Sequence, residues 1–409
     1  MKLWFKYAAG ILFGAAIFAV SPKNLLETGG ALASLSEIAL RIGYYVLGAL
    51  LCVNLPLSVL KLYEEKKFWA IGLRSLFFFT LSIFVATVLG IVAALIVLPV
   101  RIPLLSDTSS QVLQGLGSGM LRIFPQNLAA IFLDTHEMAV PVFVFSLAVG
   151  LAMAHDPMAA RPAANLLDSL SRILHTINVF VTEIMGILLI PISARALHLV
   201  TVSASGGLYA SFLLIAAVAT LVLLVVVIPL AVYLLGGRKN PLPVLYSALP
   251  LALAAFASGN LRFSSGTSIR QSRENLGRRR RYNAVTLPAG LFFGRAGTAF
   301  VAALSFVIIL SSYSQLSISL PNLALIFLII PAATMAASSS MQNGPLAVLT
   351  LGCGLFGKGF ENGYLVMVPI ALLLAMFAAL IDAVWIGAAQ TLVARDLIPG
   401  DQKDPRHFI

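Results

Sequence analysis

The chain has 409 residues, of which 59% are hydrophobic and only 11% are charged. A soluble domain averages roughly 25% charged residues, so this composition excludes an ordinary soluble protein and indicates one polytopic domain in a lipid bilayer. The formal net charge of +11 is compatible with nucleic-acid binding. However, Lys and Arg gather at the ends of apolar runs, as the positive-inside rule describes, so nucleic acid is not an expected partner.

Eight apolar runs are predicted to cross the membrane, since a spanning helix needs roughly 20 residues. They cover about residues 4–20, 36–62, 69–100, 123–155, 163–199, 208–235, 284–310 and 364–394. The first run follows Lys2 and Lys6, as in a signal peptide. No good small-x-small cleavage site precedes Ser21, so we expect a retained first span. Both chain ends are then cytoplasmic.

The fourth run contains a polar break at Asp134–Glu137. Its His136 and Glu137 could form a proton relay, because ionisable groups inside a membrane are often functional. The simpler interpretation is an interfacial kink in a segmented helix, and we favour the kink.

Two further apolar stretches are broken in the middle and are predicted to be re-entrant hairpins. The first lies between Arg238–Lys239 and Arg278–Arg281, and both basic flanks should face the cytoplasm. Its interruption at Ser264–Ser268 therefore indicates a hairpin that enters from the cytoplasm. The second stretch, Pro321–Phe360, is interrupted at Ser338–Pro345 and lacks basic flanks, so we expect it to enter from outside. A hairpin followed by a span occurs twice in opposite orientation, which is typical of an inverted repeat.

Polar groups in the broken segments converge on one layer of the membrane. Arg295 lies 14 residues beyond Arg281 (295 − 281), and Asp382 lies 13 residues before Arg395 (395 − 382). At about 1.5 Å per residue, both lie roughly 20 Å inside the cytoplasmic edge. A purely structural ion pair between Arg295 and Asp382 is the simpler alternative. Ionisable groups within a membrane mark functional sites by default, so we expect a solute to bind here.

The predicted binding site combines these two charges with hydroxyl and backbone groups at the hairpin tips. Half-helix amino termini expose N–H groups, which suit a carboxylate. The residues expected to contact the solute are Arg262, Ser264, Ser265, Gly266, Arg295, Thr298, Ser338, Ser339, Ser340, Asn343, Gly344 and Asp382. The sequence contains no His-Glu-x-x-His, Cys-x-x-Cys or Gly-x-Ser-x-Gly motif. We therefore expect no enzyme activity, no catalytic residue, and no resident metal or cofactor.

These residues resemble the dicarboxylate/amino acid:cation symporter family, the glutamate transporter homologues, and the resemblance covers nearly the whole chain. The most specific match is Arg262-Phe-Ser-Ser-Gly-Thr267, similar to the arginine- and serine-rich tip of the family's first hairpin. Further matches are Thr286-Leu-Pro-Ala-Gly290, Gly297-Thr298, Ile123-Phe-Pro-Gln-Asn127 and, more loosely, Ala337–Pro345.

The resemblance implies an all-α fold with eight transmembrane helices and two opposing re-entrant hairpins, an inverted-repeat elevator transporter that forms a homotrimer in the inner (cytoplasmic) membrane. It implies a scaffold of residues 1–62 and 101–203, a moving transport domain of residues 66–100 and 207–395, and a cytoplasmic tail, 396–409. The second hairpin would be the extracellular gate. The implied activity is symport of a small anionic or zwitterionic solute, such as glutamate, aspartate or a C4-dicarboxylate.

The sequence departs from the family where cations bind. The family's span-seven motif, Asn-Met-Asp-Gly-Thr, reads Gly294-Arg295-Ala296-Gly297-Thr298 here. An ungapped alignment of span eight also places Ile386 at the family's sodium-ligand Asp. Carboxylate ligands for sodium are thus missing at Ala296 and Ile386, while Arg295 is a permanent cation. We therefore expect coupling to protons or to no ion rather than to sodium.

The same alignment changes the substrate site. Ala375 and Ala378 fall where the family has its substrate-binding Asp and Arg, and Asp382 falls at the family's Asn. Two of the side chains that hold an amino-acid substrate in its usual orientation in this family are therefore missing here. A second interpretation is an anion-selective channel or facilitator lined by Arg262 and Arg295. Paired opposing hairpins favour alternating access over an open pore.

Overall fold

The structure is a computed structural model that describes residues 2–27, 29–96, 139–204, 209–236, 240–277, 280–313, 319–337, 344–357, 359–393 and 408. Regular secondary structure within these ranges is helical throughout, and no strand occurs in them. The expected all-α architecture is confirmed at this level. The break that contains His136 and Glu137, and the match at 123–127, lie outside the described residues.

Seven helical stretches of the described chain are long and apolar enough to cross a membrane. They are formed by α1 (Leu3–Val20), α3 (Ala31–Glu64), α4 (Phe68–Ile96), α8 (Pro157–Ala204), the run α9–η1–α10 (Ala210–Val222, Leu223–Val227, Ile228–Leu235), α13 with α14 (Arg280–Phe293, Ala296–Tyr313), and η3 with α17 (Gly363–Ile370, Ala371–Val393). They coincide with seven of the eight predicted spans. The described part of the fourth is α7 (Ala139–His155), and a short helix, α2 (Lys23–Leu26), follows α1. The number and direction of crossings stay predictions.

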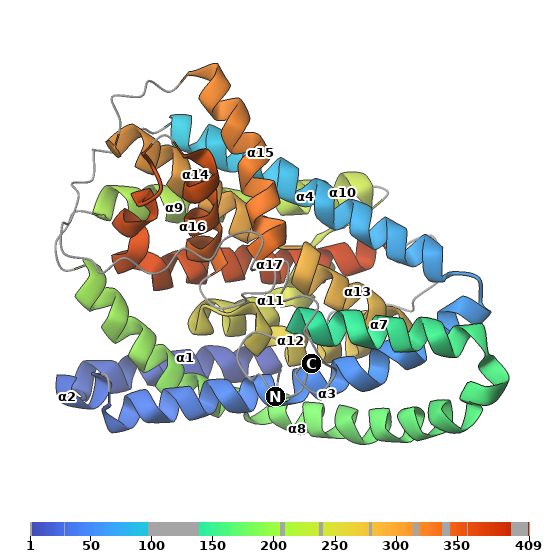
Figure 1. Cartoon of the computed structure of the whole chain (residues 1–409). Coiled ribbons are helices and arrows are strands. Elements are labelled where there is room, and N and C mark those ends of the chain that lie inside the picture. Colours follow the sequence, from blue (N-terminus) through green and yellow to red (C-terminus); the bar gives the residue numbers. More distant parts are fainter. Residues whose placement is uncertain are drawn as a thin grey trace.

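The helices form two groups that meet along the middle of the molecule (Figure 1). In one group, α3 and α8 pack together, with α1 and α7 against them. In the other, α14 packs on α4, α17 and two shorter helices, α15 (Leu320–Ala336) and α16 (Gly344–Phe356). Between the groups lie α11 (Leu242–Ser258) and α12 (Leu261–Glu274). The division into a scaffold and a moving domain, with its boundaries, stays a prediction.

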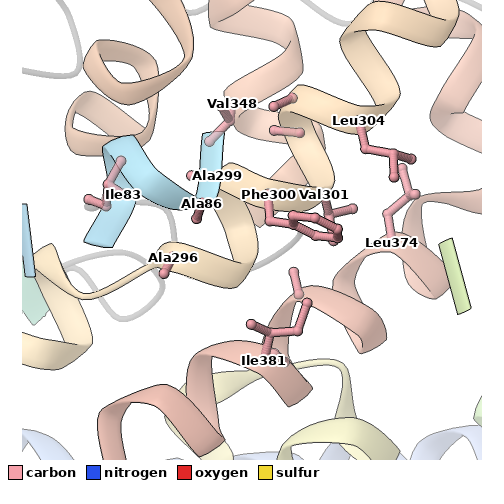
Figure 2. Packing of buried hydrophobic residues seen from close by; sticks show 14 of the residues in the cluster. Ile83, Ala86, Ala296, Ala299, Phe300, Val301, Leu304, Val348, Leu374 and Ile381 are labelled. Carbon is pink, nitrogen blue, oxygen red and sulfur yellow. The ribbon is translucent and has the colours of Figure 1, made fainter. Parts of the chain in front are cut away.

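Helix α14 is the centre of the second group. Its side chains are buried on every face, as expected of a helix that is apolar all round. Phe300, Val301 and Leu304 of α14 lie among Ile83 of α4 and Leu374 and Ile381 of α17 (Figure 2). The start of α14, where the chain breaks before Ala296, is therefore held inside the protein.

The two predicted hairpins each appear as a pair of packed short helices, α11 with α12 and α15 with α16. The turn of the first hairpin corrects the sequence prediction. It lies at Gly259, which has a left-handed φ of 62°, and Asn260, whose Oδ1 accepts a hydrogen bond from the Arg262 N–H at 2.9 Å. The predicted break, Ser264–Ser268, instead lies inside α12. Serine fits there because its hydroxyl can bond to a carbonyl one turn earlier.

Candidate functional site

The candidate site begins at the break in span seven, between α13 and α14. A broken helix leaves backbone N–H groups that need partners within a membrane protein. Asp382 of α17 supplies them: its Oδ1 accepts hydrogen bonds from the Gly297 N–H at 2.6 Å and the Thr298 N–H at 3.4 Å. Its Oδ2 accepts one from the Thr298 hydroxyl at 2.7 Å. Asp382 is only 1% exposed, so it is a buried carboxylate at the positive end of a helix.

Gly297 allows this contact. A Cβ at that position would lie 2.5 Å from the Ala378 carbonyl oxygen and 2.9 Å from the Asp382 backbone nitrogen. Both of these are backbone atoms of α17, which cannot move aside cheaply. The glycine therefore lets the start of α14 approach α17 closely enough for the Asp382 side chain to reach its amides.

Arg295 lies in the same break and points to the second hairpin. It is 4% exposed, and its Nη1 donates a hydrogen bond to the Ala337 carbonyl oxygen at 3.2 Å, at the carboxyl end of α15. Its Nη2 lies against Gly344, the first residue of α16, where an added Cβ would be 2.0 Å away. The guanidinium thus contacts both described ends of that hairpin. Arg295 and Asp382 also interact electrostatically.

The first hairpin brings a second arginine towards this site. Arg262 is half-buried near the start of α12, and its guanidinium carbon lies 5.9 Å from the centre of the Tyr44 ring of α3. It also acts electrostatically on Arg295. Two arginines and one carboxylate from three separate segments therefore share one electrostatic environment.

The other predicted residues of the first hairpin have partners within the protein. The Ser264 hydroxyl donates to the Leu261 carbonyl oxygen at 2.9 Å, and the Ser265 hydroxyl donates to the Arg262 carbonyl oxygen at 2.6 Å. Gly266 packs against α8, where its carbonyl oxygen accepts a hydrogen bond from Asn178 Nδ2 at 3.0 Å. Of the predicted residues in the second hairpin, Ser338, Ser339, Ser340 and Asn343 lie outside the described residues.

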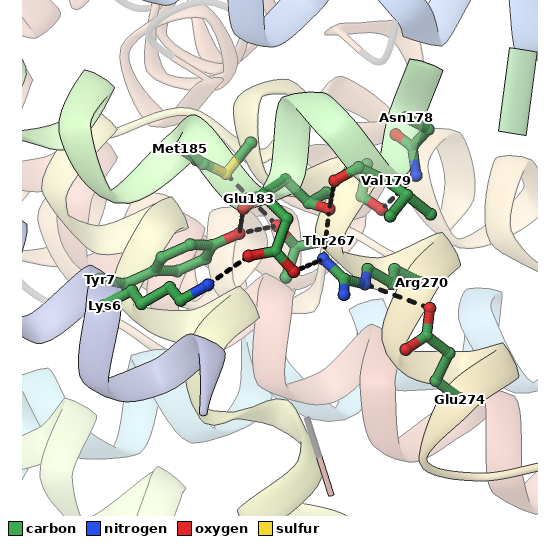
Figure 3. A network of polar contacts seen from close by, with 11 residues as sticks. Lys6, Tyr7, Asn178, Val179, Glu183, Met185, Thr267, Arg270 and Glu274 are labelled. Carbon is green, nitrogen blue, oxygen red and sulfur yellow. Dashed lines mark hydrogen bonds and ion pairs between the residues drawn. The ribbon is translucent and has the colours of Figure 1, made fainter. Parts of the chain in front are cut away.

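A cluster of polar residues that was not predicted from the sequence joins α12 to α1 and α8 (Figure 3). Its ionic centre is Arg270 of α12, whose side chain is 9% exposed and lies 2.7 Å from Glu183 Oε1 and 3.1 Å from Glu274 Oε1. Lys6 of α1 also pairs with Glu183. A glutamate inside an otherwise apolar run was the signal that could have revealed it. We call Lys6, Tyr7, Thr182, Glu183, Thr267, Arg270 and Glu274 the hairpin cluster.

Hydroxyl groups extend the hairpin cluster. The Tyr7 hydroxyl donates to the Thr182 carbonyl oxygen at 2.9 Å and lies 3.1 Å from Thr267 Oγ1. Arg270 Nη1 donates to Thr182 Oγ1 at 3.0 Å. Because these bonds link α12 to two helices of the first group, the hairpin cluster fixes the first hairpin against α1 and α8 in this conformation.

Interrupted apolar helices with buried charges at their ends are the architecture of secondary transporters. The chain belongs to the sodium:dicarboxylate symporter family, whose profile matches residues 2–396. Among curated proteins it is similar to the serine/threonine transporter SstT of Enterococcus faecalis, at 24% identity over 291 residues. That match covers 68% of this chain and 65% of the relative. The family resemblance is confirmed, and both the family and this relative are transporters rather than enzymes.

Proposed function

We propose that this protein is a secondary active transporter that moves a small carboxylate or amino acid across the inner membrane by alternating access. The observation that carries the proposal is the arrangement around Asp382 and Arg295. Asp382 holds the start of α14, while Arg295 contacts both described ends of the second hairpin. A solute bound beside these groups would interact with spans seven and eight and with the second hairpin at the same time.

The two groups of helices suggest how such a protein moves. In the proposed elevator mechanism, α4, α9–α12 and α13–α17 move together against a scaffold of α1, α3, α7 and α8. The second hairpin, α15–α16, would open as the extracellular gate. A homotrimer with both termini in the cytoplasm completes the proposal. Its support is the family membership, together with the apolar helices and the pairing of α11 with α12 and α15 with α16.

The test is uptake into liposomes that contain the purified protein. The panel is labelled glutamate, aspartate and succinate, with serine and threonine added because the relative is a serine/threonine transporter. We expect saturable uptake of at least one solute, abolished by Asp382→Asn. The matched control is Asp168→Asn, because Asp168 forms a surface pair with Arg172 away from the site. Uptake of no solute, or equal uptake by both variants, would contradict the proposal.

The alternative of an anion channel lined by Arg262 and Arg295 predicts a different result from the same liposomes. A channel would give flux that rises with voltage and does not saturate. Arg295 donates a hydrogen bond to the protein backbone and is 4% exposed, which supports a role in holding the second hairpin over one in lining an open pore.

A further inference from the structure

The family to which this chain belongs implies sodium as the coupling cation, so the residues present can be tested for a fit to it. Sodium is a hard cation that takes oxygen ligands, among which carboxylates are the strongest. Ala296 stands at the start of α14 and Ile386 on α17, and neither side chain offers an oxygen. Within the described part of the chain, no group of three or more His, Cys, Asp or Glu side chains gathers to hold a metal. These side chains do not fit a sodium site.

The guanidinium of Arg295 occupies a position where a coupling cation would be expected, at the carboxyl end of α15. The carboxyl end of a helix carries partial negative charge, and in broken transporter helices such ends coordinate cations. At the end of the 17-residue α15, the Ala337 carbonyl oxygen accepts a hydrogen bond from Arg295 Nη1 at 3.2 Å. The buried carboxylate of Asp382 adds a formal negative charge that acts on the same guanidinium.

We propose that the guanidinium of Arg295 is a built-in cation that holds the second hairpin closed in place of a coupling sodium. The inference rests on the proposed transport function for its meaning, but its physical content is local. A tethered cation cannot leave, so closing α15–α16 over the solute does not require sodium. The sodium gradient then does no work at this position, and the protein uses a proton gradient or solute exchange.

Gly344 completes the seat of this cation. An added Cβ at Gly344 would lie 2.0 Å from Arg295 Nη2 and 3.1 Å from Arg295 Cζ. The absence of a side chain therefore lets the guanidinium lie against the first turn of α16 while it bonds to the end of α15. Gly344→Ala would push the guanidinium out of its seat without removing the charge, because the end of an arginine side chain can swing away.

The inference is tested by the melting temperature of the purified protein in detergent. Sodium chloride is titrated against choline chloride at constant ionic strength, without solute. We expect no saturable, sodium-specific rise in the melting temperature of the wild type, because its cation is already present. A saturable rise with sodium and not with choline would overturn the inference. This melting-temperature measurement needs no variant and no transport. It therefore tests the inference even if the liposome experiment shows no uptake.

Removing the Arg295 guanidinium should make the stability of the protein depend on a free cation. We expect Arg295→Ala to melt several degrees lower than the wild type and to recover at least half of that loss with millimolar guanidinium or with sodium, but not with choline. Gly344→Ala should lose stability in the same direction. Arg172→Ala, which removes an arginine whose side chain is 77% exposed, is the control and should change little. A folded Arg295→Ala protein that responds to neither small cation would overturn the inference.

Discussion

Thr298 donates a hydrogen bond from its hydroxyl to Asp382 Oδ2 at 2.7 Å, and this bond ties the start of α14 to the middle of α17. Both residues are 1% exposed. The bond joins α14 to α17, so one carboxylate organises backbone amides, a hydroxyl and an arginine in the interior. The charge balance around Asp382 therefore sets the packing of the broken spans and, in the proposed function, the binding of a solute.

The first prediction concerns this balance. Removing one partner of a buried charge pair typically costs about 3–5 kcal/mol, because the other charge stays buried without compensation. Arg295→Ala should therefore destabilise the protein more than Arg295→Ala combined with Asp382→Ala. A double-mutant cycle on melting temperatures in detergent measures the difference. Additive losses from the two substitutions would mean that Arg295 and Asp382 act independently.

The second prediction concerns the close approach of α14 and α17. Gly297→Ala places a Cβ 2.5 Å from the backbone oxygen of Ala378, so it should lower the melting temperature and abolish uptake. Gly48→Ala in α3 is the matched control, because no atom lies within 4 Å of its added Cβ. Alanine exceeds glycine in helix propensity by roughly 1 kcal/mol, so Gly48→Ala should be neutral or stabilising. Equal effects of the two substitutions would show that the approach at Gly297 is unimportant.

The third prediction separates packing from solute contact at the first hairpin. A Cβ at Gly266 would lie 2.5 Å from Asn178 Oδ1, whereas the next nearest atoms are 3.6 Å and 3.7 Å away. Gly266→Ala should reduce uptake by pushing α12 away from α8, and adding Asn178→Ala should restore most of it. Rescue in uptake assays would assign Gly266 to the contact between helices. Uptake that stays lost in the stable double variant would instead favour the solute contact expected from the sequence.

The fourth prediction concerns topology, which rests on charge alone. Lys239→Cys and Arg280→Cys, each in a background that lacks Cys52 and Cys353, should react only with membrane-permeant reagents in intact cells. The basic flanks of the first hairpin would then both be cytoplasmic. Labelling of either cysteine by an impermeant reagent from outside would contradict a hairpin that enters from the cytoplasm. Labelling of only one of the two would show that the segment between them crosses the membrane an odd number of times.

The helices and the two central charges could be predicted from the sequence because lipid constrains both strongly. A membrane span must satisfy its own backbone, so apolar length predicts α1, α4 and α17 directly. Charges within such runs are rare, and Arg295 and Asp382 were therefore conspicuous.

Local side-chain hydrogen bonds and contacts between distant residues are harder to predict from the sequence. The serines at 264 and 265 resembled a break, yet they bond to carbonyls of their own helix, and the turn instead uses the left-handed Gly259 and the capping Asn260. The hairpin cluster pairs Glu183 with Arg270, residues far apart in the chain, and only the packing of α8 on α12 brings them together.

Counterflow in proteoliposomes tests most directly whether this protein transports by alternating access. Vesicles are loaded with an unlabelled solute that the uptake panel identifies, then diluted into a trace of the same solute in labelled form. We predict a transient accumulation of label above equilibrium in the wild type, and none with Asp382→Asn. A conductance for anions without any such overshoot would contradict the account and indicate a channel.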